Sequence, residues 1–235
     1  METIGFLLYA AALALASLAL VQSVVAGGIG VLAYVSARVA RRKLSRRELS
    51  GVLLSVVGLV ALGISLARGS GGGGTGSTVA ILLWLAVTAA VALLLVAIGR
   101  RFGKAAVMYG LAGGLFFSIG DVSTKVATQG GLRWAFVISL IVGYTLGTAL
   151  LQIGYQAGGA LTVAGLATLL TNAVPIAAGT IVLDEPVPGG VLGGLRVLAF
   201  GAVTIGAVLL AHPADASEHA PVTHSPGADD GKERG

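Results

Sequence analysis

The chain has 235 residues, of which 56% are hydrophobic and only 11% are charged, and its mean hydropathy is +0.95. A soluble domain carries about 25% charged residues, so a water-soluble globular fold is excluded and lipid is the expected solvent. Cysteine is absent, which excludes disulfides and thiolate metal sites, and the net charge of +5 lies in short loops rather than on a surface for nucleic acid.

Long apolar stretches predict an all-α, polytopic membrane helix bundle, because crossing the hydrocarbon takes about 20 apolar residues as a helix. We predict about eight transmembrane helices: 3–17, 20–39, 51–67, 79–98, 105–127, 134–153, 160–183 and 189–211. The first two together are shorter than two full spans, so the first is expected to be clipped at its N-terminus. A cleaved signal peptide is disfavoured, since Glu2 is the only charged side chain near the start.

Nine lysines and arginines fall in two segments, 38–47 and 99–104. Positive loops stay in the cytoplasm, and an eight-span count puts both segments on the same side. The loops around 69–78, 128–133 and 184–189 are then expected to face outward, with both termini cytoplasmic in a bacterial-type inner (cell) membrane. Residues 212–235 lack periodicity and predict a disordered cytoplasmic tail.

Three glycines recur at a constant offset of 143: Gly51, Gly58 and Gly63 return as Gly194, Gly201 and Gly206. The offset predicts two inverted repeats, the architecture of alternating-access transporters. The mate of span 105–127 would precede residue 1, so the first helix of the first repeat is expected to be missing. The predicted organisation is a first, clipped repeat (1–67), an outward Gly-rich loop with a linker helix (68–104), a second repeat (105–211) and the tail (212–235).

Polar side chains recur on one face of each of two predicted spans, and polar groups do not face lipid unpaired. The predicted substrate-binding residues are Tyr144, Thr148, Gln152 and Tyr155 on span 134–153, with Thr168, Thr171 and Asn172 on span 160–183. Pro175 also frees the carbonyl of Thr171 one turn earlier, which favours a binding site. The alternative is that these groups bridge packed helices.

Asp121 and Lys125 lie one helical turn apart in span 105–127 and are predicted to pair. Two roles stay open for them: a proton or cation coupling site facing the cavity, or a structural salt bridge near the outer interface. No nucleophile–base set, metal-ligand cluster or phosphate loop is present in the sequence, so we expect neither an enzyme nor a cofactor.

Several short motifs resemble the drug/metabolite transporter superfamily (DMT, EamA-like), most closely the NIPA-type magnesium transporters and their bacterial relatives. The similar residues are Arg101-Phe102-Gly103 followed by Val107-Met108-Tyr109, then Lys125, Gln152-Ile-Gly-Tyr155 and Leu183-Asp-Glu185. The resemblance implies an inner-membrane carrier. Arg42 departs from the family, which has an acidic residue there, and members carry a further N-terminal helix. A misassigned start, a fragment and a genuine variant each account for its absence.

We therefore expect a transporter that moves a small solute or cation through a cavity between the two repeats. Magnesium is one candidate, although Mg²⁺ prefers several oxygen ligands and the predicted spans hold one carboxylate. Membrane lipid is the expected environment, a homodimer is a candidate assembly, and nucleic acid is not an expected partner. The alternative is a non-transporting membrane subunit or an inactive, truncated paralogue.

Overall fold

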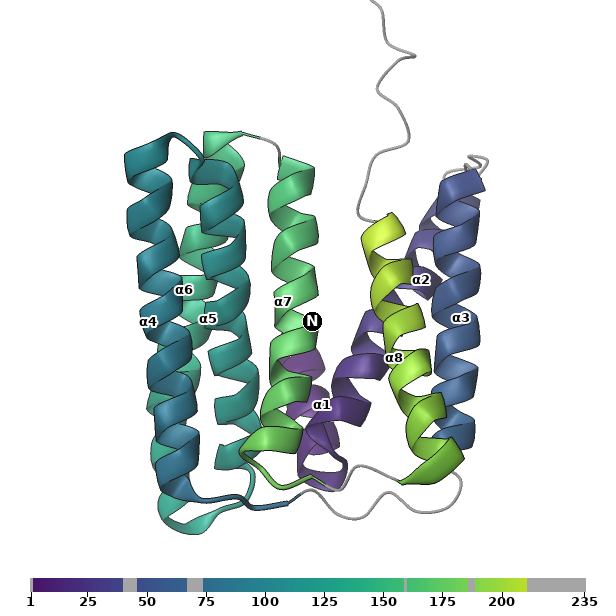
Figure 1. Cartoon of the computed structure of the whole chain (residues 1–235), viewed down its shortest axis with the longest axis horizontal. Coiled ribbons are helices and arrows are strands. Elements are labelled where there is room, and N and C mark those ends of the chain that lie inside the picture. Colours follow the sequence, from purple (N-terminus) through teal and green to yellow (C-terminus); the bar gives the residue numbers. More distant parts are fainter. Residues whose placement is uncertain (1, 40–45, 67–73, 159, 186–188, 211–235) are drawn as a thin grey trace, which may run out of the picture.

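The computed structural model describes residues 2–39, 46–66, 74–158, 160–185 and 189–210 (Figure 1). These residues form eight α-helices and one short 3₁₀-helix, with no strand among them. The helices are α1 (Glu2–Leu15), α2 (Leu18–Val39), α3 (Arg46–Leu66), α4 (Thr78–Phe102), α5 (Ala105–Ala127), η1 (Gly131–Ala135), α6 (Phe136–Ala157), α7 (Ala160–Ile181) and α8 (Gly190–Leu210). The predicted all-α bundle is confirmed, and the predicted tail lies outside the described residues.

Four helical stretches in the described part of the chain have the length and apolar composition needed to cross a membrane. They are Thr78–Phe102, Ala105–Ala127, Gly131–Ala157 and Val163–Ile181; shorter apolar stretches occur at Thr3–Leu15, Leu49–Gly58 and Gly190–Gly206. Large apolar side chains cover the outside of α4, where Leu82, Leu83 and Val87 are all exposed. Apolar residues outside and polar residues inside are typical of a protein dissolved in lipid, so the fold is that of a helical membrane protein.

Helix α5 is the centre of one half of the bundle. It packs against α4, α6 and α7 and also contacts α1 (Figure 1). Most of its residues are buried, and among them are the polar residues Ser118, Asp121, Ser123, Thr124 and Lys125. Helices α2, α3 and α8 form the other half, with α1 between the two halves at the lower end of the view.

Small residues let α5 approach its neighbours closely. A Cβ atom at Gly114 would lie 2.7 Å from the carbonyl oxygen of Ala167, and one at Gly143 would lie 2.7 Å from the amide nitrogen of Gly120. Glycine stripes of this kind are typical of membrane helix contacts. Gly194 of α8, in contrast, has nothing within 4 Å of an added Cβ, so this glycine has no such packing role.

The three predicted pairs of repeat mates all run in opposite directions. In Figure 1, α3 descends while α8 ascends, α2 ascends while α7 descends, and α1 descends while α6 ascends. Helices α3 and α8 also pack along one another, with Gly58 against Ala199 and Gly206 against Gly51. Opposite directions are necessary for inverted repeats, but they occur in any bundle whose helices alternate in direction, so the two repeats stay a prediction.

The described parts of the two basic segments lie at one end of the bundle, while residues 40–45 are outside the described residues. The last turn of α2 with Arg38, the first turn of α3 with Arg46, and the α4–α5 turn at Gly103 are all at the upper end of Figure 1. The α1–α2 turn, the start of α4 and η1 are at the lower end. A common location for both basic segments is what the predicted topology needs, and which end faces the cytoplasm stays a prediction.

Candidate functional site

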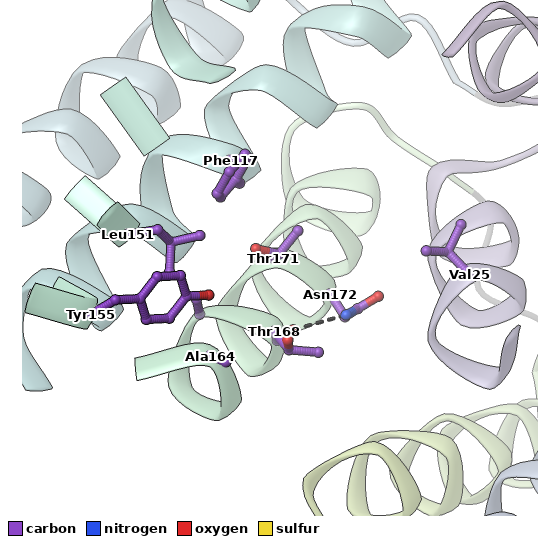
Figure 2. Close-up of a pocket in the computed structure, with 9 residues that line it drawn as sticks. Val25, Phe117, Leu151, Tyr155, Ala164, Thr168, Thr171 and Asn172 are labelled. Carbon is purple, nitrogen blue, oxygen red and sulfur yellow. Dashed lines mark hydrogen bonds between the residues drawn. The ribbon is translucent and has the colours of Figure 1, made fainter. Parts of the chain in front are cut away.

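A cavity of about 280 Å³ lies between α2, α5, α6 and α7 (Figure 2). Helix α7 supplies more than half of its lining, and Val25 of α2 faces it from the opposite side. The nine lining residues are Val25, Phe117, Leu151, Tyr155, Ala164, Ala167, Thr168, Thr171 and Asn172. Four of the seven predicted substrate-binding residues therefore meet at this cavity: Tyr155, Thr168, Thr171 and Asn172.

Asn172 supplies an amide near the middle of α7, and its side chain is buried. Its Nδ2 donates a hydrogen bond of 2.8 Å to the carbonyl of Thr168, one turn back on the same helix. Its Oδ1 is buried and has no hydrogen-bond partner among the described residues. Figure 2 shows the amide lying between α7 and Val25, so an unused acceptor faces the space between the two halves.

Pro175 follows Asn172 inside α7. Proline has no amide hydrogen, so the carbonyl of Thr171 loses the donor that it would have in a regular helix. Thr171 is one of the residues that line the cavity. The side chains of the lining offer hydrogen bonding through hydroxyl and amide groups, together with apolar contact.

Thr148 and Gln152 do not reach this cavity. Both are exposed on α6, whereas Leu151 and Tyr155 of the same helix line the cavity. Our prediction that Gln152 faces inward is therefore wrong. Helix α6 packs on α5 and α7 through its glycines; a Cβ at Gly154, for example, would lie 2.9 Å from a methyl carbon of Val163. Close glycine contact fixes the rotation of α6, and this rotation leaves Thr148 and Gln152 on its exposed face.

Tyr144 lies at a second polar site beside the cavity. Its hydroxyl donates to Asp121 Oδ1 at 2.7 Å, and the hydroxyl of Tyr9 donates to the same oxygen at 2.9 Å. Gln22 completes the chain, because its Nε2 donates to the Tyr9 oxygen at 2.9 Å. Helices α1, α2, α5 and α6 thus meet through one hydrogen-bonded cluster, which we call the Asp121 cluster (Tyr9, Gln22, Asp121 and Tyr144).

Lys125 is not part of that cluster, and the predicted pairing with Asp121 is not formed. Its Nζ instead donates to the carbonyl oxygens of Leu13 and Ala16, each at 2.6 Å. The last carbonyls of a helix have no partner within the helix, and a cation there also meets the negative end of the helix dipole. Lys125 is therefore a buried cap for the C-terminus of α1.

The Asp121 cluster touches the wall of the cavity through aromatic side chains. The ring of Tyr144 lies 6.0 Å from that of Phe117, centre to centre, and Phe117 lines the cavity. The ring of Phe6 in α1 meets Tyr144 edge-on at 6.1 Å. Tyr144 therefore links the two sites, because it contacts Asp121 on one side and the cavity residue Phe117 on the other.

No protein-family model, curated protein or solved structure matches this chain. Within the ranges that the structure describes, no group of three or more His, Asp or Glu side chains is placed to hold a metal ion.

Sequence reasoning missed three residues of these sites. Tyr9 and Gln22 belong to the first two spans, where no polar stripe drew attention, although Gln22 is the only side-chain amide in either. Glu185, noted only within an acidic turn, is buried and accepts from the amide of Leu18 at 2.6 Å. Its partner lies 167 positions away in the sequence, so no local pattern could have found that contact.

Proposed function

We propose that this protein is a membrane carrier that moves a small solute through the cavity between α2 and α5–α7. The observation that carries the proposal is the Oδ1 atom of Asn172, buried at mid-helix and unpaired among the described residues. A buried acceptor without a partner costs about 1–3 kcal/mol, so such an atom is expected to meet a ligand or water.

The arrangement of the helices supports the same proposal. Three pairs of helices run in opposite directions, and the cavity lies where the two halves of the bundle face each other. Carriers built from inverted repeats hold their substrate at the repeat interface near the bilayer midplane and move one repeat against the other. Membership of the drug/metabolite transporter superfamily is part of this proposal and rests on the short motifs given above.

The lining of the cavity bears on the class of solute. All nine lining residues are uncharged; four of them offer hydroxyl or amide groups and the rest are apolar. Such a surface suits a small solute that has at least one hydrogen-bond donor and an apolar part. The resemblance to NIPA-type proteins adds Mg²⁺, as a hydrated ion, to the solutes that must be tested.

The test is uptake by proteoliposomes across a panel of Mg²⁺, other cations and small metabolites. Asn172→Leu replaces the amide with an apolar group of similar shape, so saturable uptake should fall at least about tenfold. Gln152→Leu is the matched control, because it makes the same change on the exposed face of α6. Equal loss of uptake in both variants, or no uptake of any panel member by the unmodified protein, would contradict the proposal.

A further inference from the structure

Asp121 is a carboxyl group inside the bundle, with only 4% of its surface exposed. Its two oxygens differ. Oδ1 accepts the hydroxyls of Tyr9 and Tyr144, from α1 and α6, whereas Oδ2 is buried without a hydrogen-bond partner among the described residues. One oxygen thus accepts two hydrogen bonds, and the other accepts none from the described residues.

The groups around Asp121 do not neutralise its charge. Lys125 is one turn away, but its Nζ is held by the carbonyls at the end of α1. Helix α7 has no titratable residue, and the arginines of α4 lie in its last turn, at the other end of the bundle. Among the described residues, the titratable groups that contact the carboxyl are the phenols of Tyr9 and Tyr144, which are neutral donors. An ionised carboxylate without a counter-ion is costly in a membrane.

We propose that Asp121 is a proton-binding site, with Oδ2 as the atom that takes the proton. The proton adds to the carboxylate and removes its negative charge, while both phenols keep their own protons and continue to donate to Oδ1. The neighbours favour a proton over a metal ion, because they present hydrogens to the carboxyl. The Tyr9 oxygen, moreover, already accepts from Gln22.

Protonation at Oδ2 would be transmitted to two cavities. Hydrogen bonds to a charged acceptor are about twice as strong as those to a neutral one, so protonation weakens the hold of α5 on Tyr9 and Tyr144. Tyr9 lines a second cavity of about 360 Å³ between α1 and α2, and Tyr144 touches Phe117 in the wall of the first. Val25 lines both cavities. A carrier of this form can couple proton binding to the position of α1 and α6.

This proposal deepens the proposed carrier function, but its test needs no transported solute, so the two can fail separately. The full-length protein is reconstituted in lipid, and the infrared carbonyl band of protonated carboxyl groups is followed from about pH 4 to about pH 9. We expect a titrating band that is absent in Asp121→Asn and retained in Asp184→Asn. Asp184 is an exposed carboxylate, which makes it the matched control.

A second variant keeps the test valid if Asp121→Asn disturbs folding. Tyr144→Phe removes one donor to Oδ1 and leaves the ring in place, so the carboxylate is less favoured and its band should titrate about one pH unit higher. Three results would overturn the proposal: a spectrum without an Asp121-dependent band, a band that does not change with pH, or a band that disappears when Na⁺ alone is added at constant pH.

Discussion

Lys125 and Glu185 cap the two helix ends that meet at the turn between α1 and α2. Lys125 donates to the carbonyls of Leu13 and Ala16 at the end of α1, and the carboxylate of Glu185 accepts from the amide of Leu18 at the start of α2. A helix ends with unpaired carbonyls and begins with unpaired amides, and its dipole has the matching signs. The two opposite charges also interact electrostatically with each other. The turn between α1 and α2 is therefore fixed by a cation on one side and an anion on the other.

Removing either cap should destabilise the protein. Lys125→Met and Glu185→Gln are each expected to lower the free energy of unfolding by about 2 kcal/mol, because hydrogen bonds to a charged group are lost inside the protein. The double variant should lose less than the sum, since each single change leaves the other charge uncompensated. Unfolding in detergent measures all three, with Lys104→Met as the exposed lysine control. Strictly additive losses would show that the two caps act independently.

The helices themselves were predictable from the sequence. Span 105–127 coincides with α5, and span 20–39 differs from α2 by two residues at one end. Apolar length alone places such helices, because a lipid-embedded segment has to be both apolar and helical. The largest difference is at α3, which begins at Arg46 rather than at residue 51. Hydropathy detects the part of a helix in lipid, whereas the charged first turn of α3 is helical without being apolar.

The contacts of the candidate sites were less predictable. Helical spacing correctly put Thr168, Thr171 and Asn172 on one face of α7, because that relationship is local. The same reasoning paired Asp121 with Lys125 and failed. Spacing within one helix says which side chains are near each other, but the partners offered by α1 come from the tertiary packing. Lys125 donates to carbonyls at the end of α1, whereas Asp121 accepts from the phenols of Tyr9 and Tyr144.

Packing of α3 against α8 depends on Gly206 more than on Gly201, although both belong to the repeated glycine pattern. A Cβ at Gly206 would lie 2.4 Å from the hydroxyl of Ser55 and 2.8 Å from the carbonyl of Gly51, whereas Gly201 has nothing within 4 Å. Gly206→Ala should therefore separate the helices and lower the unfolding temperature. Gly201→Ala, on the same helix, should be neutral or stabilise by up to about 1 kcal/mol through helix propensity. Equal effects of the two changes would contradict this account of the contact.

The side of the membrane on which the basic segments lie can be tested without background labelling, because the chain has no cysteine. Ser50→Cys and Ser77→Cys place single exposed thiols at opposite ends of the bundle. An impermeant thiol reagent added to intact cells should label position 77 and should label position 50 only after permeabilisation. This follows from the retention of lysines and arginines in the cytoplasm. Labelling of position 50 in intact cells, with protection of position 77, would reverse the predicted topology.

The segment before α4 should tolerate no side chain at Gly76. Its backbone has φ +60°, and an added Cβ would lie 2.0 Å from the carbonyl oxygen of Val182. Arg133 holds the segment there by donating to the carbonyl of Gly76 at 2.8 Å.

Gly103 is the matched control, because it has φ +67° but nothing within 4 Å of an added Cβ. Gly103→Ala should cost about 1 kcal/mol for the backbone conformation alone. Gly76→Ala should lower the stability further, because the added Cβ also clashes with the carbonyl of Val182. The hydrogen bond from Arg133 keeps the segment from moving away to relieve that clash. Thermal unfolding of the two variants side by side measures the difference, and equal losses would show that the segment is free to move away from Val182.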